Sequence, residues 1–240
     1  MIVRSVDDRL QLITQPDHAR LALRIMEGCA PLRARPRPDT ILFAIREHDN
    51  GWTELDAAPM VDASTGRIAD FMTAPVPARQ EVWPRGVGRI QEPWAAALVA
   101  QHALTIYDRY RERPEWSAFF ATMESMRDER LQEAGGSLDD LMGDYAFVRL
   151  GDLVSLAFCT GWTEEQRFGE WAVQRFDTRI VVTPDAFAAR TIPFEITARE
   201  LPDRPFTSDA DLRDALGAAA LTFLRGEICP NVSATSPCKS

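Results

Sequence analysis

Several classes of protein are excluded by what this sequence lacks. No apolar run reaches the roughly 18 residues that a membrane-spanning helix needs. The N-terminus shows no apolar core behind a basic start, so we expect no secretory signal. The four cysteines show no CxxC spacing, and Cys29 and Cys159 stand in apolar helical contexts, where buried free thiols are usual. The sequence therefore predicts a reduced, cytoplasmic protein.

Positive charge is scarce as well. Lys and Arg number 27 against 36 Asp and Glu, which gives a formal net charge of −9 and a pI near 4.9. Nucleic-acid and anionic-membrane surfaces depend on an excess of Lys and Arg, so we expect neither kind of partner. The predicted partner is a small molecule, and the sequence assigns no oligomeric state.

What is present is a helical pattern over much of the chain. Hydrophobic residues make up 45% of the 240 residues, enough to bury a sizeable core. Apolar positions recur at helical spacing in five stretches. These stretches are residues 16–29, 39–49, 94–106, 115–134 and 138–159.

The remaining segments complete a mainly α prediction. We expect an N-terminal extended arm over 1–14, a long loop over 53–93, a small C-terminal β-hairpin from 179–183 and 191–198, and a closing helix over 208–224. A disordered tail is expected over 227–240. The predicted fold is thus one helical-bundle domain, residues 1–226.

Histidine occurs only three times in the chain, and each histidine falls on a predicted helical face. They are His18, His48 and His102, and His48 is followed at once by Asp49. Asp152 interrupts the apolar face of a later helix, where an unpaired carboxylate would cost several kcal/mol to bury. Imidazole and carboxylate ligands together suit Mn, Fe, Co, Ni or Zn, so the pattern indicates a site for one or two divalent ions.

Simpler explanations exist for each residue taken alone. A single histidine on an apolar face is more often a hydrogen-bonded core residue than a ligand. Asp152 could instead pair with Arg149, or the whole set could form a polar core without metal. The joint occurrence of three histidines and an isolated aspartate on buried faces favours the metal site.

Three segments carry a resemblance to known families. They are Leu12-Ile13-Thr14-Gln15-Pro16-Asp17-His18, Glu47-His48-Asp49-Asn50-Gly51-Trp52 and Ile192-Pro193-Phe194. With them, most of the chain resembles an uncharacterised bacterial domain-of-unknown-function family, DUF3891. The order His, His-Asp, Asp on successive helices also resembles, more distantly, the HD-domain metal-dependent phosphohydrolases.

The resemblance to HD proteins implies a fold, a ligand set and an activity. It implies an HD-like helical bundle in which His18, His48, Asp49 and Asp152 bind the metal. The activity implied is hydrolysis of phosphate esters or anhydrides by a metal-activated water. Asp49 and His102 are then the candidate catalytic residues, His102 as a second-metal ligand or a general acid.

This sequence departs from the HD pattern in its phosphate-binding residues. The only lysine is Lys239, so an arginine must bind any phosphate, with Arg20 and Arg46 as the first candidates and Arg67 and Arg85 as others. Substrate contacts are also expected from Trp52 and Asp56, which follow the His-Asp pair, although Asp56 could instead be a solvated loop carboxylate, an alternative that its position slightly favours.

Two other functions stay open at this point. The same residues could form a metal site in a non-catalytic sensor or structural protein, an alternative that the missing lysine slightly favours. Two iron ions bound by such ligands could also activate dioxygen. Trp83, like Trp52, could wall a pocket, although large aromatic side chains more often only bury area.

Overall fold

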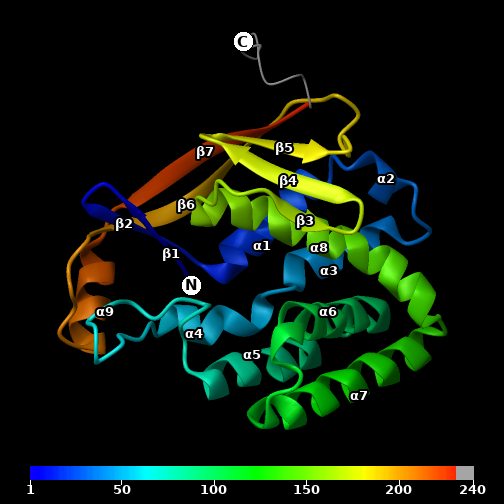
Figure 1. The fold of residues 1–240 in the computed structure, drawn as a ribbon, viewed down its shortest axis with the longest axis horizontal. Coiled ribbons are helices and arrows are strands. Elements are labelled where there is room, and N and C mark those ends of the chain that lie inside the picture. The colour runs from blue at the N-terminus through cyan, green and yellow to red at the C-terminus, as the bar shows by residue number, and fades with distance from the viewer. Residues whose placement is uncertain (231–240) are drawn as a thin grey trace.

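A seven-stranded mixed sheet spans one side of the molecule in this computed structural model, which describes residues 1–230 (Figure 1). Its order is β1-β2-β6-β7-β5-β4-β3, and every neighbouring pair is antiparallel except β5 and β7. The strands are β1 Ile2–Val6, β2 Arg9–Ile13, β3 Gln166–Phe168, β4 Trp171–Phe176, β5 Arg179–Thr183, β6 Ile192–Pro202 and β7 Leu221–Cys229.

The helices lie in layers beneath this sheet. They are α1 Gln15–Met26, α2 Ala30–Arg33, α3 Pro38–Glu47, α4 Thr53–Ala57, α5 Val76–Gly88, α6 Pro93–Ile106, α7 Ser117–Ala134, α8 Leu138–Thr160 and α9 Asp209–Ala218. Helices α1 and α8 pack directly against the sheet, and α5, α6 and α7 lie on the side away from it (Figure 1). Helix α3 contacts α1, α6 and α8, so these four helices meet in the interior.

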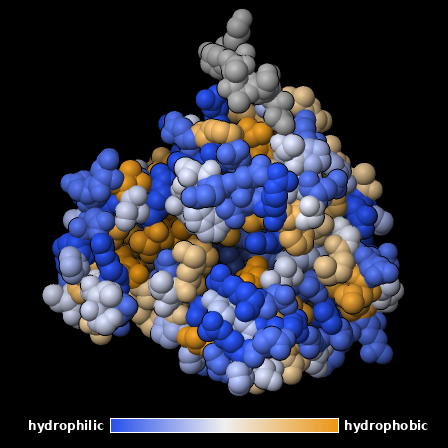
Figure 2. Space-filling view, viewed as in Figure 1, coloured by the Kyte–Doolittle hydropathy of each residue, from blue (hydrophilic) through white to orange (hydrophobic). Residues whose placement is uncertain are grey.

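The two faces of the sheet bury different cores. Ile13 and Ile196 belong to the large core shared with α1 and α8. Leu10 and Leu201, which are paired across β2 and β6, face the other way and pack with Leu212 of α9. Side chains alternate between the faces of a strand, which explains the division. Figure 2 shows hydrophobic residues gathered in the hollow beside α9, in the left part of the view.

The predicted fold class, a mainly α bundle with a small C-terminal hairpin and an extended N-terminal arm, is wrong. The arm is the β1–β2 hairpin, and β2 pairs with β6 from the other end of the chain. The strands expected to pair with each other, β5 and β6, each pair with β7 instead. Apolar alternation marks a strand but does not identify its partner, so the pattern at 179–183 and 191–198 revealed two strands but not their pairing with distant segments.

Other segment predictions also need correction. The stretch expected to be a long loop, 53–93, contains α4 and α5; Pro84 inside α5 and its weak apolar periodicity concealed the helix. The closing helix ends at Ala218, and the chain continues into β7, which covers the start of the expected tail to Cys229. Residues 231–240 lie outside the described residues. No helix within residues 1–230 is long and apolar enough to cross a membrane.

Candidate metal centre

The first candidate ligand, His18, stands in the opening turn of α1. Thr14 ends the preceding strand segment and caps the helix, its side-chain oxygen accepting a hydrogen bond from the Asp17 N–H at 3.1 Å. Pro16 stands in the first turn, where its missing N–H costs nothing. The His18 side chain is fully buried, so the turn from β2 into α1 directs an imidazole into the interior.

The His-Asp pair lies where α3 ends. His48 is the C-cap residue, and Asp49 begins a short 3₁₀ turn, Asn50–Trp52. Neither Asn50 nor Gly51 has a positive φ, so the helix ends without a residue in the left-handed conformation. Gly51 is needed for close approach: a Cβ there would lie 1.9 Å from the Val82 carbonyl oxygen of α5.

Asp152 projects from the middle of α8, the long buried helix. The preceding residue, Gly151, packs against α1 and α3, where an added Cβ would lie 2.9 Å from Met26 Cγ and 3.4 Å from Ile45 Cγ2. A residue without a side chain at this point lets the three helices approach closely. The buried carboxylate of Asp152 thereby reaches the two histidines.

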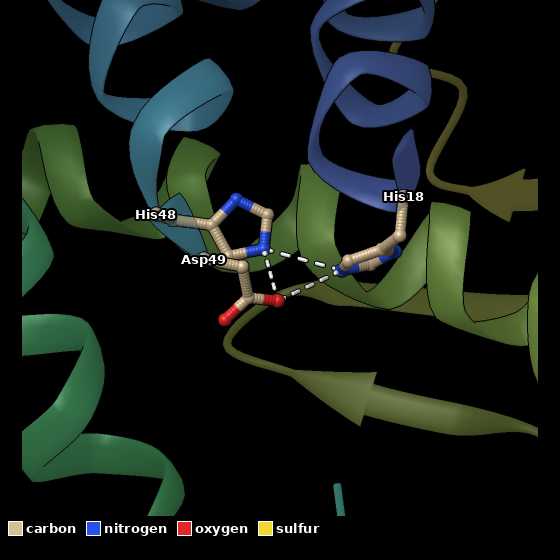
Figure 3. A group of neighbouring side chains, drawn as sticks. All are labelled: His18, His48 and Asp49. Atoms are coloured by element: carbon tan, nitrogen blue, oxygen red, sulfur yellow. Dashed lines mark hydrogen bonds and ion pairs between the residues drawn. The ribbon is translucent and has the colours of Figure 1, made fainter. Parts of the chain in front are cut away.

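Ligand atoms of four side chains lie close together, and Figure 3 shows three of these side chains, His18, His48 and Asp49. The His18 Nε2 atom lies 3.2 Å from His48 Nε2 and 3.2 Å from Asp152 Oδ1. The Asp49 Oδ2 atom lies 3.5 Å from His18 Nε2 and 3.4 Å from His48 Nε2. His48 Nε2 is 3.5 Å from Asp152 Oδ1. All four side chains are buried.

These separations match the edges of a coordination polyhedron. Metal–ligand distances of about 2.1 Å place neighbouring ligand atoms about 3.0 Å apart in an octahedron and about 3.4 Å apart in a tetrahedron. The observed 3.2–3.5 Å falls in this range for two imidazoles and two carboxylates. These separations therefore fit ligands of a divalent transition-metal ion, with Asp49 and Asp152 belonging to different groups of ligand atoms within 4.8 Å that share His48.

The outer contacts of His48 favour ligation through Nε2. Its Nδ1 lies 2.6 Å from the Ile45 carbonyl oxygen, which only accepts, so Nδ1 must carry the proton. The Nε2 lone pair of the neutral ring then faces the cluster, as in metal sites whose histidine is oriented by a carbonyl. His18 Nδ1, by contrast, has no hydrogen-bond partner among residues 1–230.

The histidines and carboxylates of the cluster stabilise each other's charged forms even without an ion. Burial opposes the charge on His48, but Asp49 and Asp152 outweigh it and raise the pKa of His48 to about 10. Burial likewise opposes ionisation of Asp49, yet the histidines lower its pKa. The pKa of Asp152 lies well below its usual range because Arg149 and the two histidines outweigh burial.

His102, on α6, lies at the edge of this group. Its Nε2 is 3.8 Å from Asp152 Oδ2, and its Nδ1 is 3.3 Å from the Tyr145 hydroxyl. With His48 and Asp152 it forms a second set of three buried groups whose ligand atoms lie within 4.8 Å of one another. Burial, with the charge on His48, lowers the pKa of His102 to about 3, so its imidazole is neutral.

A cavity of about 280 Å³ opens beside the cluster. Its polar lining includes Asp49, His102, Asp152, Arg109 and Arg149, and the Arg149 guanidinium donates a hydrogen bond to Asp152 Oδ2. Its apolar and aromatic lining is Trp52, Phe71, Met72, Trp83, Ile106, Tyr107, Leu156 and Trp162. The buried site thus has a route to solvent lined by both apolar surface and cations.

The structure places only some of the predicted substrate residues in this cavity. Trp52 lines this cavity, and so does Trp83. Arg20 is instead exposed on α1, paired with Asp17, and Arg46 is exposed beside Glu47; neither lines the cavity.

Asp56 also lies away from the cluster. Its buried carboxylate forms an ion pair with the Met1 amino group and accepts a hydrogen bond from the Gln15 N–H at 2.5 Å. It lines a different, larger cavity of about 560 Å³ near α9, which none of the four candidate ligands lines. As predicted contacts of a substrate at the cluster, Arg20, Arg46 and Asp56 are misplaced.

Two cationic residues that line the cavity, Arg109 and Arg149, were not among the predicted substrate residues. Arg149 was considered only as a partner of Asp152; its position one turn before that aspartate gave the available signal. Arg109 stands in a short 3₁₀ turn, Asp108–Tyr110, among several exposed charges, and no local pattern distinguishes it.

Comparison with known families gives one match. The model of the family described as "Protein of unknown function (DUF3891)" matches residues 1–203. Since the match spans well over half of the 240 residues, the chain belongs to that family, as its sequence resemblance predicted. Neither the curated proteins nor the solved structures gave a match. The more distant resemblance to HD phosphohydrolases stays a prediction.

Proposed function

We propose that this member of the DUF3891 family is a metal-dependent hydrolase acting on a phosphate ester or anhydride of a small metabolite. The observation that carries the proposal is the convergence of His18, His48, Asp49 and Asp152 at 3.2–3.5 Å beside a cavity lined by two arginines. The proposed cofactor is one or two divalent ions of Mn, Fe, Co, Ni or Zn.

The metal and the protein side chains would divide the chemistry. A bound divalent ion would lower the pKa of a water ligand and so supply a nucleophile at neutral pH. His102 Nε2, neutral and lining the cavity, is placed to take up or return a proton there. Arg149 and Arg109 can donate hydrogen bonds to phosphate oxygens, in place of the lysine that the sequence lacks.

The cavity walls support the same reaction class. Trp52 and Trp83 are almost fully buried beside the cluster and restrict the entry of bulk water. A low-polarity wall strengthens the attraction between the arginines and an anionic substrate. The proposal includes the cytoplasmic location predicted from the cysteines, and Cys29 and Cys159 are buried thiols outside any disulfide.

Elemental analysis tests the metal, and a phosphoester screen tests the activity. Protein purified without a histidine tag should hold about one or two equivalents of a transition metal, lost in His48→Ala and in Asp152→Ala. The loaded protein should release phosphate from generic esters, and both variants should fail while keeping their circular-dichroism spectra. No metal after reconstitution would refute the proposal. Metal without turnover would support the non-catalytic sensor or structural role instead.

A further inference from the structure

We infer that the cavity beside the cluster selects small phosphate monoesters with a flat apolar group, and that Arg109 acts with Arg149 to hold the phosphate. This inference rests on the proposed function for the fate of the ester and for the ion that neutralises the carboxylates, whereas the preference for a flat apolar group rests on the cavity lining. It assigns Arg109 a role that its sequence context does not suggest.

The walls of the cavity define the apolar part of the ligand. Five aromatic side chains line it: Trp52, Phe71, Trp83, Tyr107 and Trp162. Met72, Ile106 and Leu156 add further apolar surface. Aromatic walls offer large flat contact areas, which favour a planar ring over a chain of hydroxyl groups.

The charges in the cavity define the anionic part. Two arginines line it, and its only carboxylates are those of Asp49 and Asp152, both candidate metal ligands. A bound divalent ion would neutralise these carboxylates, leaving the guanidinium groups to face the ligand. The local field is therefore positive in a chain of net charge −9, which suits a phosphate dianion.

Arg109 is the more available of the two cations. Its guanidinium carbon lies 4.8 Å from the centre of the Tyr110 ring, and with Arg79 it lowers the pKa of the Tyr110 hydroxyl against the effect of burial. Within residues 1–230 it forms no ion pair with a carboxylate. Arg149, in contrast, is already paired with Asp152.

Volume limits the size of the ligand. A cavity of about 150 Å³ holds benzene, so the 280 Å³ here accommodates one ring with roughly 130 Å³ left for a phosphate group. A sphere of 280 Å³ is only about 8 Å across, so the two arginines that line it face the same small volume. A single-ring monoester fits these limits, whereas larger phosphate compounds would project into solvent.

Binding of two phosphonates to the full chain tests the inference without turnover. Phenylphosphonate and methylphosphonate share an anionic group that cannot be hydrolysed at its C–P bond, and only the first carries a ring. Binding is followed by isothermal titration calorimetry and by quenching of tryptophan fluorescence, since three tryptophans line the cavity. We expect phenylphosphonate to bind about tenfold more tightly than methylphosphonate, consistent with burial of a ring.

Arg109→Ala is the decisive variant, because the exposed Arg109 side chain adds little to the packing of the fold. It should weaken phenylphosphonate binding about tenfold, as loss of a charge-assisted hydrogen bond does, and Arg109→Lys should restore part of it. Arg111→Ala is the matched control, since Arg111 pairs with Asp108 and Glu124 and does not line the cavity. Equal affinity for the two phosphonates, or unchanged affinity in Arg109→Ala, would overturn the inference.

Turnover then separates this inference from the proposed function. Selective phenylphosphonate binding, with no hydrolysis of phenyl phosphate by the metal-loaded protein, would support the inferred ligand class and refute the hydrolase. Hydrolysis of phenyl and methyl phosphate with equal kcat/KM would support the hydrolase and refute the inferred selectivity.

Discussion

Arg149 and Asp152, one turn apart on α8, form an ion pair at the boundary between the buried cluster and the cavity. The Asp152 side chain is 4% exposed and that of Arg149 is 21% exposed. Arg149 therefore compensates the charge of the buried Asp152 carboxylate, and it lies on the side of the cluster that faces the cavity. A metal ion at the cluster would supply a second compensating charge to the same carboxylate.

Replacement of Arg149 should destabilise the metal-free protein more than the metal-bound protein. Arg149→Met leaves Asp152 buried with less compensating charge, and we expect a loss of about 2 kcal/mol in the free energy of unfolding. The loss should shrink when a divalent ion is present, because the ion takes over the role of countercharge. Urea denaturation with chelator and with added metal measures both values.

The control for this variant is an arginine whose ion pair is more exposed. Arg130→Met on α7 removes a pair with Glu133, and such surface pairs contribute at most about 1 kcal/mol. Its small effect should not depend on metal. A metal-independent loss in Arg149→Met would show that the cluster does not bind an ion near Asp152.

Metal affinity should rise with pH across the neutral range. The pKa of His48 is raised from 6.5 to about 10, so at pH 7 the metal-free site holds a proton that the metal must displace. One displaced proton predicts up to a tenfold gain in affinity for each pH unit below about 10. Competition with a chromogenic chelator at pH 6, 7 and 8 measures this slope, and a flat profile would contradict it.

The same pKa shift predicts the opposite trend in stability for the metal-free protein. A group whose pKa is raised on folding stabilises the fold fully below its unfolded value of 6.5, and this contribution is lost as pH rises towards 10. The melting temperature of chelated protein should therefore fall between pH 7 and pH 9. His48→Gln should remove most of this decline, and an unchanged decline in that variant would assign it to other groups.

His102 should be needed for turnover more than for metal retention. Its Nε2 lies 3.8 Å from Asp152 Oδ2, farther than the contacts among the four converging ligands. We expect His102→Ala to lower kcat about 100-fold, the usual scale of general acid–base assistance, with metal content near that of the wild type. Tyr145→Phe, which removes the hydroxyl beside His102 Nδ1, should give a smaller loss. Loss of one metal equivalent in His102→Ala would make His102 a ligand instead.

The sequence revealed the candidate site better than it revealed the fold. His18, His48 and Asp152 lie on helices that apolar spacing predicts, and burial of polar side chains on such faces is a local property. The cap at Ser137 is equally local: its side chain accepts a hydrogen bond from the Asp140 N–H three residues later. These features depend on neighbours within a few residues.

The features that the sequence did not reveal depend on distant contacts. The pairing of Leu10 with Leu201 joins strands almost 200 residues apart, and β7 follows a helix without a distinct apolar alternation. The role of Arg109 follows from the walls that α5, α6 and α8 place around it. Asp56 followed the His-Asp pair in sequence, yet the short helix α4 directs it to the Met1 amino group.

Gly51 should be among the least replaceable residues of the site's scaffold. An added Cβ would lie 1.9 Å from the Val82 carbonyl oxygen and 3.3 Å from Gly86 Cα, both backbone atoms of α5, so one element must move. Because Asp49 lies two residues earlier, that movement would also disturb the cluster. We expect Gly51→Ala to cost roughly 2–4 kcal/mol in the free energy of unfolding and to weaken metal binding.

Gly88→Ala, at the end of α5 with no atom within 4 Å of the new Cβ, is the matched control and should be neutral or slightly stabilising. Equal unfolding free energies for the two variants would show that the turn after Asp49 adapts, and that close packing against α5 does not hold the His-Asp pair in place.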